Sequence, residues 1–194
     1  MKKSFISLAF SLMLIFSMKA DFKPRVTVIN YDVPVGAVKI NGFGGMAISQ
    51  ELYHFMQELL PQGSTILEFG SGFGTGQLAK HFIMYSVEHN HQFVNRHSSN
   101  YIHAPIVNNW YNLDILKSKL PPSYDAILID GPPRCIGRRG FLENIEMFDV
   151  SVPLIFDDVH IDIEWQIMFD TAKQLKRNCI VYVCQEKKWG VIFP

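Results

Sequence analysis

The chain has few cysteines, no excess of either charge and only one long apolar run. Its 194 residues include three cysteines, and Lys+Arg and Asp+Glu both number 18, so the formal net charge is zero. This balance excludes a basic nucleic-acid-binding protein and an acidic solvating tail as descriptions of the whole chain. An odd number of cysteines excludes a framework in which all of them pair, and no Cys/His spacing indicates zinc. With 48% hydrophobic residues, the chain can bury the core of one domain.

The apolar run lies at the N-terminus. Lys2 and Lys3 precede an apolar stretch over residues 5–16, and a segment ending at Ala20 follows it. Residues 1–20 therefore have the layout of a secretory signal peptide, although Met18 fits the cleavage rule poorly. The run is shorter than the roughly 20 residues of a membrane span. Three interpretations stay open: a cleaved signal, a signal-anchor, and a start codon assigned too early, which would leave the protein in the cytoplasm. Contact with a membrane is expected only through this segment.

The remaining pattern predicts an α/β fold. Residues 21–45 are expected to form an N-terminal arm or sheet edge, and residues 46–194 a single domain. Helices are expected over 46–60, 76–82, 138–148 and 161–176, with a short helix ending near 96; strands are expected over 65–69, 84–88, 101–107, 124–130, 152–156, 179–184 and 189–193. Continuous apolar strands that alternate with helices indicate a mostly parallel sheet covered on both faces. The last two strands read as a closing hairpin.

A glycine-rich turn carries the clearest chemical signal. Residues 66–76 read Ile-Leu-Glu-Phe-Gly-Ser-Gly-Phe-Gly-Thr-Gly, so a strand delivers Glu68 and glycines then recur at every second position. Glycine lets the backbone approach a ligand closely, and the start of a helix adds a positive dipole end. The dinucleotide pattern is met only from Gly74 to Ala79, too far beyond the strand. No Lys-Ser/Thr pair completes a phosphate-binding Walker motif.

A second acid ends the next strand. Glu88 lies 20 residues after Glu68, in the segment Ser86-Val87-Glu88-His89. A carboxylate at that place can accept hydrogen bonds from both ribose hydroxyls of a nucleoside. A helix-capping or surface acid is the alternative.

Together these segments resemble the class I S-adenosylmethionine-dependent methyltransferases. Residues 68–74 are similar to the family's glycine motif, residues 87–89 to its ribose-binding acid, and residues 125–133 to its fourth-strand motif. The resemblance covers about residues 46–194. It implies a Rossmann-like, seven-stranded, mostly parallel sheet with a C-terminal antiparallel hairpin, and S-adenosylmethionine as cofactor. The cofactor-binding residues that it implies are Glu68, Gly70, Ser71, Gly72, Gly74, Glu88, His89 and Asp130.

A finer resemblance points to an O-methyltransferase branch. Residues 87–89, 130–132, 137–138 and 156–160 are together similar to the branch that includes glycan methyltransferases such as the glucuronoxylan methyltransferases. That resemblance implies O-methylation of a small-molecule or glycan acceptor. A non-catalytic binding module and an aminopropyltransferase on the same fold are alternatives. No nucleic-acid partner is expected, and the sequence leaves the oligomeric state open.

Three aspartates end two neighbouring strands. Asp130 follows one strand, and Asp157 and Asp158 follow the other, so all three are expected to converge at the carboxyl edge of the sheet. They are candidate catalytic residues and candidate ligands of Mg²⁺. His160 is a further candidate base. The catechol-type O-methyltransferases carry a lysine three residues after the first acid, where this chain has Pro133, which favours a metal-free reaction.

Basic residues follow the first of these acids. Arg134, Arg138 and Arg139 are candidate clamps for an anionic acceptor. A solvated start of a helix is the alternative interpretation.

Overall fold

The computed structural model describes residues 22–185 and 187–194 of the chain, so the predicted signal or anchor at residues 1–20 lies outside the described residues. Within the described part, every helix is too short or too polar to cross a lipid bilayer.

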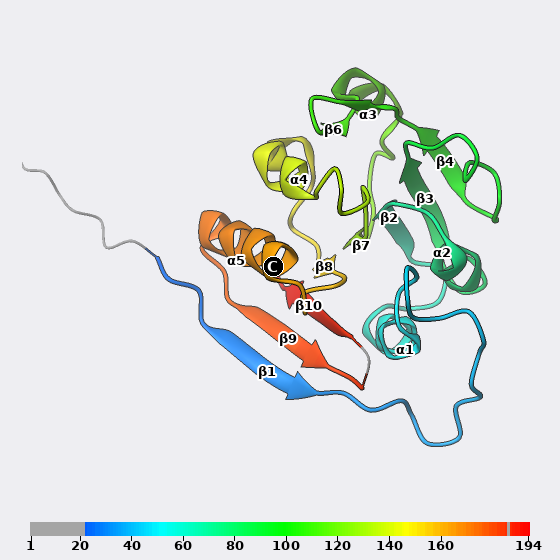
Figure 1. Ribbon diagram of the computed structural model, residues 1–194, viewed down its shortest axis with the longest axis vertical. Helices are drawn as coiled ribbons and strands as arrows, with labels where there is room; N and C mark the ends of the chain where they lie inside the picture. Colours follow the sequence, from blue (N-terminus) through cyan, green and yellow to red (C-terminus); the bar gives the residue numbers. More distant parts are fainter. Residues whose placement is uncertain (1–21, 186) are drawn as a thin grey trace, which may run out of the picture.

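An eight-stranded mixed sheet forms the centre of the molecule (Figure 1). Its order is β1-β9-β10-β8-β7-β2-β3-β4. The strands are β1 (Val26–Asn30), β2 (Thr65–Phe69), β3 (Ile83–Glu88), β4 (Asn100–His103), β7 (Ala126–Ile129), β8 (Leu154–Phe156), β9 (Cys179–Val183) and β10 (Lys188–Ile192). Strand β10 runs antiparallel to β8 and β9, and the other pairs are parallel. The predicted Rossmann-like fold with a C-terminal antiparallel hairpin is confirmed, and β1 adds an eighth strand.

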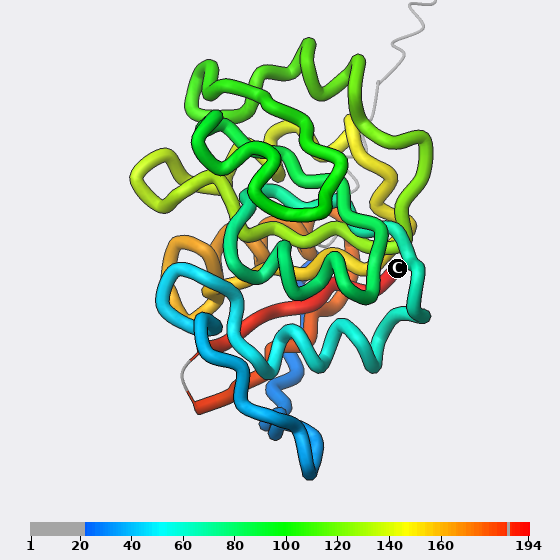
Figure 2. Tube along the Cα trace, turned by 90° about the vertical axis from the view of Figure 1, so that its right-hand side faces the viewer, coloured from blue at the N-terminus to red at the C-terminus, as the bar shows by residue number. Residues whose placement is uncertain are grey.

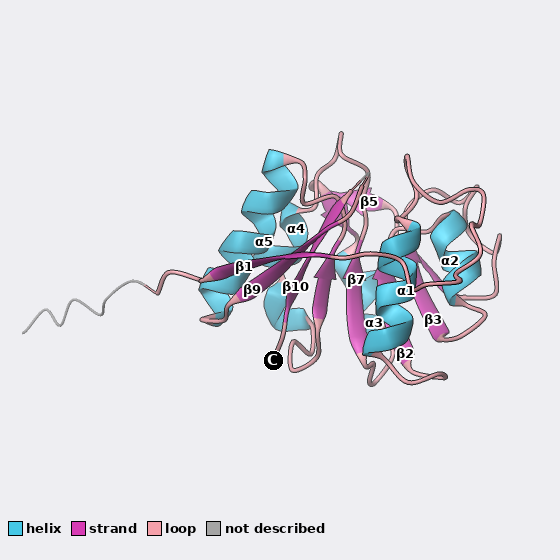
Figure 3. Ribbon diagram, turned by 90° about the horizontal axis from the view of Figure 1, so that it is seen from below, coloured by secondary structure: helices cyan, strands magenta, loops and turns pink. Residues whose placement is uncertain are grey.

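Helices cover both faces of the sheet (Figures 1 and 3). Helices α1 (Gln50–Leu59) and α2 (Phe73–Leu78) pack on one face, against a core that includes Ile66, Leu128 and Val191. Helices α3 (Leu113–Lys119), α4 (Arg139–Glu143) and α5 (Asp162–Leu175) pack on the other, over a core that includes Leu67 and Ile127. Successive strand residues therefore face opposite cores, as the alternation of side chains along a strand requires.

The expected N-terminal arm contributes the edge strand β1. This strand pairs in parallel with β9 from Val26 to Asn30, so it ends at the carboxyl edge of the sheet. The segment that follows then runs along the molecule to reach α1 (Figures 1 and 3). Figure 2 shows this segment, in blue, projecting at one end of the molecule beside the C-terminal hairpin.

The first two helices start at other residues than predicted, because local hydrogen bonds fix where they begin. Helix α1 begins at Gln50 rather than Met46, because the Ser49 hydroxyl caps it by accepting a hydrogen bond from Leu52 N at 3.1 Å. Helix α2 begins at Phe73, inside the glycine motif, where Gly72 N donates to the Thr75 hydroxyl at 3.0 Å. The glycine turn is therefore shorter than predicted.

Other predicted boundaries were also wrong. The strand predicted over 101–107 divides at Pro105, because proline cannot donate to a ladder; β5 (Ile106–Val107) then pairs with β6 (Trp110–Tyr111). Residues 91–99 form turns rather than the expected short helix. The helix predicted over 138–148 divides into α4 and a 3₁₀ turn at Ile145–Met147. Helix α3 was missed, because seven residues hold barely two turns of periodic signal.

Candidate functional site

The glycine turn connects β2 to α2 at the carboxyl edge of the sheet. Gly70 has φ +89°, and a Cβ atom there would lie 3.1 Å from Gly131 N, so glycine is needed where β2 and β7 approach each other. Gly72 differs, because a Cβ atom at that position would meet no atom within 4 Å. The turn therefore offers open space beside its backbone at Gly72.

Glu68 supports this turn from behind. Its side chain is buried and accepts hydrogen bonds from Thr75 Oγ1 at 2.9 Å and from Ser86 Oγ at 2.6 Å. Burial raises the pKa of Glu68 to about 7, although the hydrogen bonds from Ser86 and Thr75 act in the opposite direction. Glu68 thus fixes the start of α2 against β3.

Glu88 ties the end of β3 to the glycine turn. Its Oε2 atom accepts a hydrogen bond from Ser71 N at 3.0 Å, and its Oε1 atom accepts one from Asn90 N at 2.7 Å. The His89 Nδ1 atom lies 3.0 Å from the same Oε1 atom. The carboxylate is therefore oriented beside the open turn, at the edge where parallel α/β sheets bind ligands.

The three predicted aspartates converge beside these residues. Asp130 follows β7, and Asp157 and Asp158 follow β8, and one carboxylate oxygen from each lies within 4.8 Å of the others. Asp158 has φ +62°, a conformation that a residue other than glycine adopts only where its surroundings impose it. The expected convergence at the carboxyl edge is confirmed.

Two buried cations enter the same cluster. Arg138 Nη2 donates to Asp130 Oδ1 and to Asp158 Oδ2, both at 3.1 Å. Lys187 Nζ donates to Asp157 Oδ2 at 3.1 Å and lies 2.8 Å from Asp158 Oδ1. Arg138, a candidate clamp for the acceptor, thus binds the protein's own acids. Lys187 was missed, because a lysine in a hairpin turn reads as a solvated residue.

The cations give the three carboxyl groups different acidities. Burial raises the pKa of Asp130 well above its usual value, the charge of Asp157 raises it further, and Arg138 only partly opposes them. Burial also raises the pKa of Asp157, against the attraction of Lys187. Burial acts in the same direction on Asp158, but the hydrogen bonds and charges of Lys187 and Arg138 prevail and lower its pKa. Of the three, Asp158 therefore loses its proton most readily, and Asp130 and Asp157 hold theirs more strongly.

A magnesium ion does not fit this cluster as it is arranged. The ion prefers one or two carboxylates completed by waters. In this cluster each aspartate already accepts from Arg138 or Lys187, so an ion would have to displace their side chains. The carboxylate of Glu164, 3.8 Å from Arg138 Nε, adds a further internal partner.

The remaining predicted residues are exposed, and a buried tyrosine adds a polar group at this edge of the sheet. His160 is exposed in the turn before α5, and Arg134 and Arg139 are exposed as well. Tyr111 on β6 is completely buried, and its hydroxyl has no hydrogen-bond partner among the described residues. That hydroxyl lies 2.7 Å from the position of a Cβ atom on Gly131. An unpaired buried hydroxyl costs about 1–3 kcal/mol, so Tyr111 is an unsatisfied polar group beside the turn after β7.

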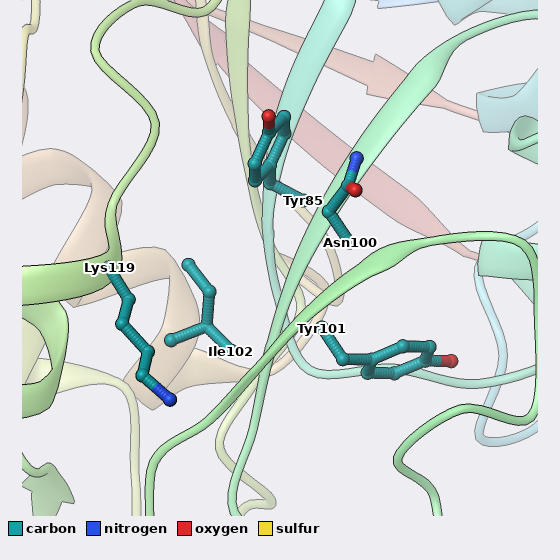
Figure 4. A pocket seen from close by; sticks show the side chains of 5 residues that line it. All are labelled: Tyr85, Asn100, Tyr101, Ile102 and Lys119. Atoms are coloured by element: carbon teal, nitrogen blue, oxygen red, sulfur yellow. The ribbon is translucent and has the colours of Figure 1, made fainter.

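Two cavities lie near the two edge strands of the sheet, one beside β4 and one beside the segment after β1. One, of about 390 Å³, is lined by Tyr85, Asn100, Tyr101, Ile102 and Lys119. Figure 4 shows the Tyr101 ring pointing away from Lys119. The other, of about 580 Å³, lies between the segment after β1, the start of α1 and the C-terminal hairpin. Neither of these two cavities is lined by Glu88 or Asp130.

Solved methyltransferases share this fold. A methyltransferase from Pyrococcus furiosus matches 73% of this chain and 80% of its own, with a TM-score of 0.51 and 15% identity. The METTL16 MTase domain matches with a TM-score of 0.52 and 11% identity, over 84% of this chain and 72% of its own. At such identities the likeness shows the fold alone. No family model matches the chain. No curated protein matches it either.

Proposed function

We propose that this protein is an S-adenosylmethionine-dependent methyltransferase. The observation that carries the proposal is the hydrogen bond from Ser71 N to Glu88 Oε2, which sets a carboxylate beside the open glycine turn. A nucleoside at this place has an acceptor for its ribose hydroxyls and space against the backbone at Gly72. The fold shared with solved methyltransferases supports the same conclusion.

The cofactor, when bound, supplies an electrophilic methyl group, and the protein's own residues position and deprotonate the acceptor. Glu88 holds the ribose, and the glycine turn admits the rest of the cofactor. Asp130, in its ionised form, takes the proton of the acceptor. Its raised pKa makes that carboxylate a stronger base than an ordinary aspartate, and its Oδ2 atom accepts no hydrogen bond from the described residues. Asp158, kept ionised, orients Arg138 and Lys187. Alignment of acceptor and methyl group provides much of the rate.

The acceptor that we propose is a hydroxyl group of a small molecule or glycan. The zero net charge of the chain gives no general attraction to nucleic acid. A raised-pKa carboxyl group at the sheet edge is a suitable base for a hydroxyl. Transfer of radiolabelled methyl groups to a panel of hydroxyl acceptors distinguishes this reaction from a non-catalytic module, which would bind the cofactor without turnover.

Glu88→Ala tests the cofactor site. We expect the variant to bind S-adenosylhomocysteine at least about tenfold more weakly in isothermal titration, because a hydrogen bond to a charged group contributes roughly 1.5–3 kcal/mol. Glu146→Ala, at an exposed glutamate on the 3₁₀ turn, is the matched control and should bind as the unchanged protein does. Absence of binding to the folded, unchanged protein would refute the proposed function. Equal binding by Glu88→Ala would refute only the ribose assignment.

A further inference from the structure

We propose that the cavity of about 580 Å³ beside the segment after β1 is the acceptor site, and that it takes a neutral, hydroxyl-rich molecule such as a short oligosaccharide. This inference rests on the proposed function and names the substrate class. The volume lies within the range of small-molecule sites, about 300–1,000 Å³. The lining residues that carry the argument are Tyr31, Asp32, Asn41, Phe43, Gln50 and Gln185.

The cavity lies at the same edge of the sheet as the candidate cofactor site. Strands β1 and β9 are parallel, so Tyr31, which follows β1, and Gln185, which follows β9, both lie beyond carboxyl ends. Strand β10 is antiparallel to β9 and to β8, so β9 also runs in the same direction as β8, which ends at Phe156, just before Asp157. Ligands of open α/β sheets bind outside this edge.

Direct contacts join the walls of the cavity to both halves of the candidate site. Gly42 packs so closely on the Phe73 ring, at the start of α2, that a Cβ atom would lie 2.7 Å from it. On the other side, Lys187 Nζ donates to Ala47 O at 2.7 Å and lies 2.8 Å from Asp158 Oδ1. The segment after β1, most of which lines the cavity, thus contacts both the start of α2 and Lys187 of the acid cluster.

The walls are held in place by contacts of their own. The Tyr31 ring meets Trp189 edge-on at 5.3 Å between centroids, and its hydroxyl donates to Glu58 at 2.9 Å. Gln50 fixes the backbone of the segment, because its Oε1 accepts from Ile40 N at 3.0 Å and its Nε2 donates to Val38 O at 2.8 Å. Such support favours binding, since less freedom is lost when the ligand arrives.

The lining combines aromatic rings with polar groups that have no partner. Among the described residues, the side chains of Asp32, Asn41 and Gln185 are exposed to solvent and make no hydrogen bond or ion pair with another residue. A carboxylate and two amides offer acceptors and donors that match hydroxyl groups. Because Asp32 and Glu51 outnumber Lys39, the lining has one net negative charge. An anionic acceptor is therefore disfavoured, and a neutral polyol or sugar fits best.

The test is a nuclear magnetic resonance titration of the full ¹⁵N-labelled chain, saturated with S-adenosylhomocysteine, with cellobiose, xylobiose, N,N′-diacetylchitobiose and glucuronate. We expect at least one neutral disaccharide to shift the amide signals of residues 31–44 and Gln185. Ala37→Phe should weaken that binding at least tenfold, because Ala37 lines the cavity and the larger ring fills it. Val35→Phe is the matched control, since Val35 on the same segment is fully exposed.

Several results would overturn the inference. They are the absence of shifts at the cavity with all three neutral disaccharides, stronger binding of glucuronate, shifts confined to the cavity at Tyr85 and Lys119, and equal binding by Ala37→Phe and the unchanged protein. The proposed function fails separately, because binding of S-adenosylhomocysteine is measured first and without any sugar.

Discussion

At the scale of single residues, the two glycines Gly70 and Gly72 differ in role, and so do the two aspartates Asp130 and Asp158. Gly70 is required by a positive φ and by the close approach of Gly131, whereas Gly72 is extended and borders open space. Asp130 and Asp158 both contact Arg138, yet burial raises the pKa of Asp130, whereas the pKa of Asp158 is lowered because the hydrogen bonds and charges of Lys187 and Arg138 outweigh the effect of its burial. The surroundings, and not the residue type, decide each role.

Gly72→Val separates folding from cofactor binding. The backbone at Gly72 suits any residue and nothing lies within 4 Å of its Cβ position, so the variant should unfold within about 0.5 kcal/mol of the unchanged protein. Its branched side chain fills the space proposed for the cofactor, so affinity for S-adenosylhomocysteine should fall at least tenfold, about 1.4 kcal/mol. Calorimetry measures the affinity and urea unfolding measures the stability. The affinity of Gly72→Ala should lie between those of the unchanged protein and Gly72→Val. Normal binding by Gly72→Val would reduce Gly72 to a turn residue.

At the scale of elements, the site is assembled from the ends of strands. The turn after β2, the end of β3, and the ends of β7 and β8 each contribute one part of it. The hairpin of β9 and β10 adds Lys187, whose side chain reaches back to β8 and to the segment after β1. Each part is a short loop on a rigid strand, so its position follows from the sheet.

Lys187→Met tests how this hairpin supports the cluster. Asp158 has a lowered pKa in the folded protein, so the stability it contributes is present above the unfolded pKa of about 3.9 and is lost as the pH falls through the folded pKa. Removing the lysine leaves the buried Asp157 carboxyl group without a cation and Asp158 with Arg138 alone, and should cost roughly 3–5 kcal/mol near neutral pH. The cost should shrink below about pH 4.

Urea unfolding between pH 3 and pH 8 measures this difference. Lys188→Met is the matched control, since Lys188 is exposed on the neighbouring position. Lys187→Arg should recover part of the lost stability by restoring the charge. A loss that does not change with pH would show that Lys187 acts through packing alone.

At the scale of the whole molecule, opposite charges are balanced overall, and two cations offset part of the charge within the buried cluster. The net charge is zero, and the three aspartates at the sheet edge are contacted by Arg138 and Lys187 from distant parts of the chain. Strand β1 is the outermost strand of the sheet, and the segment after β1 runs from its carboxyl end towards α1. Each of the three aspartates thus has a cation of the chain itself beside it.

A chelator should therefore leave methyl transfer unchanged. With the full chain and an acceptor in hand, we expect the rate in the presence of EDTA to equal that in its absence, within about twofold, because the described residues provide internal cations for the three aspartates. Asp130→Asn should still lower turnover about 100-fold or more, as loss of a general base does. Activity abolished by the chelator and restored by Mg²⁺ alone would contradict this arrangement.

The sequence by itself determined the parts that depend on neighbouring residues. The apolar run of β2, the glycines after it, and acids at the ends of β3, β7 and β8 are local patterns, and parallel strands bring their carboxyl ends together. The sequence therefore predicted the fold and the convergence of Asp130, Asp157 and Asp158.

Only the tertiary structure decided which cations meet these acids. Lys187 lies 30 residues beyond Asp157 and Arg138 lies 20 before Asp158, and only the pairing of β10 with β8 and the packing of α4 bring them together. The same holds for Tyr111 and for the cavity beside β1, which depend on long-range pairing. The local sequence does not identify the distant partner of a charged or aromatic side chain, because the protonation and burial of that side chain depend on groups that only the fold brings near.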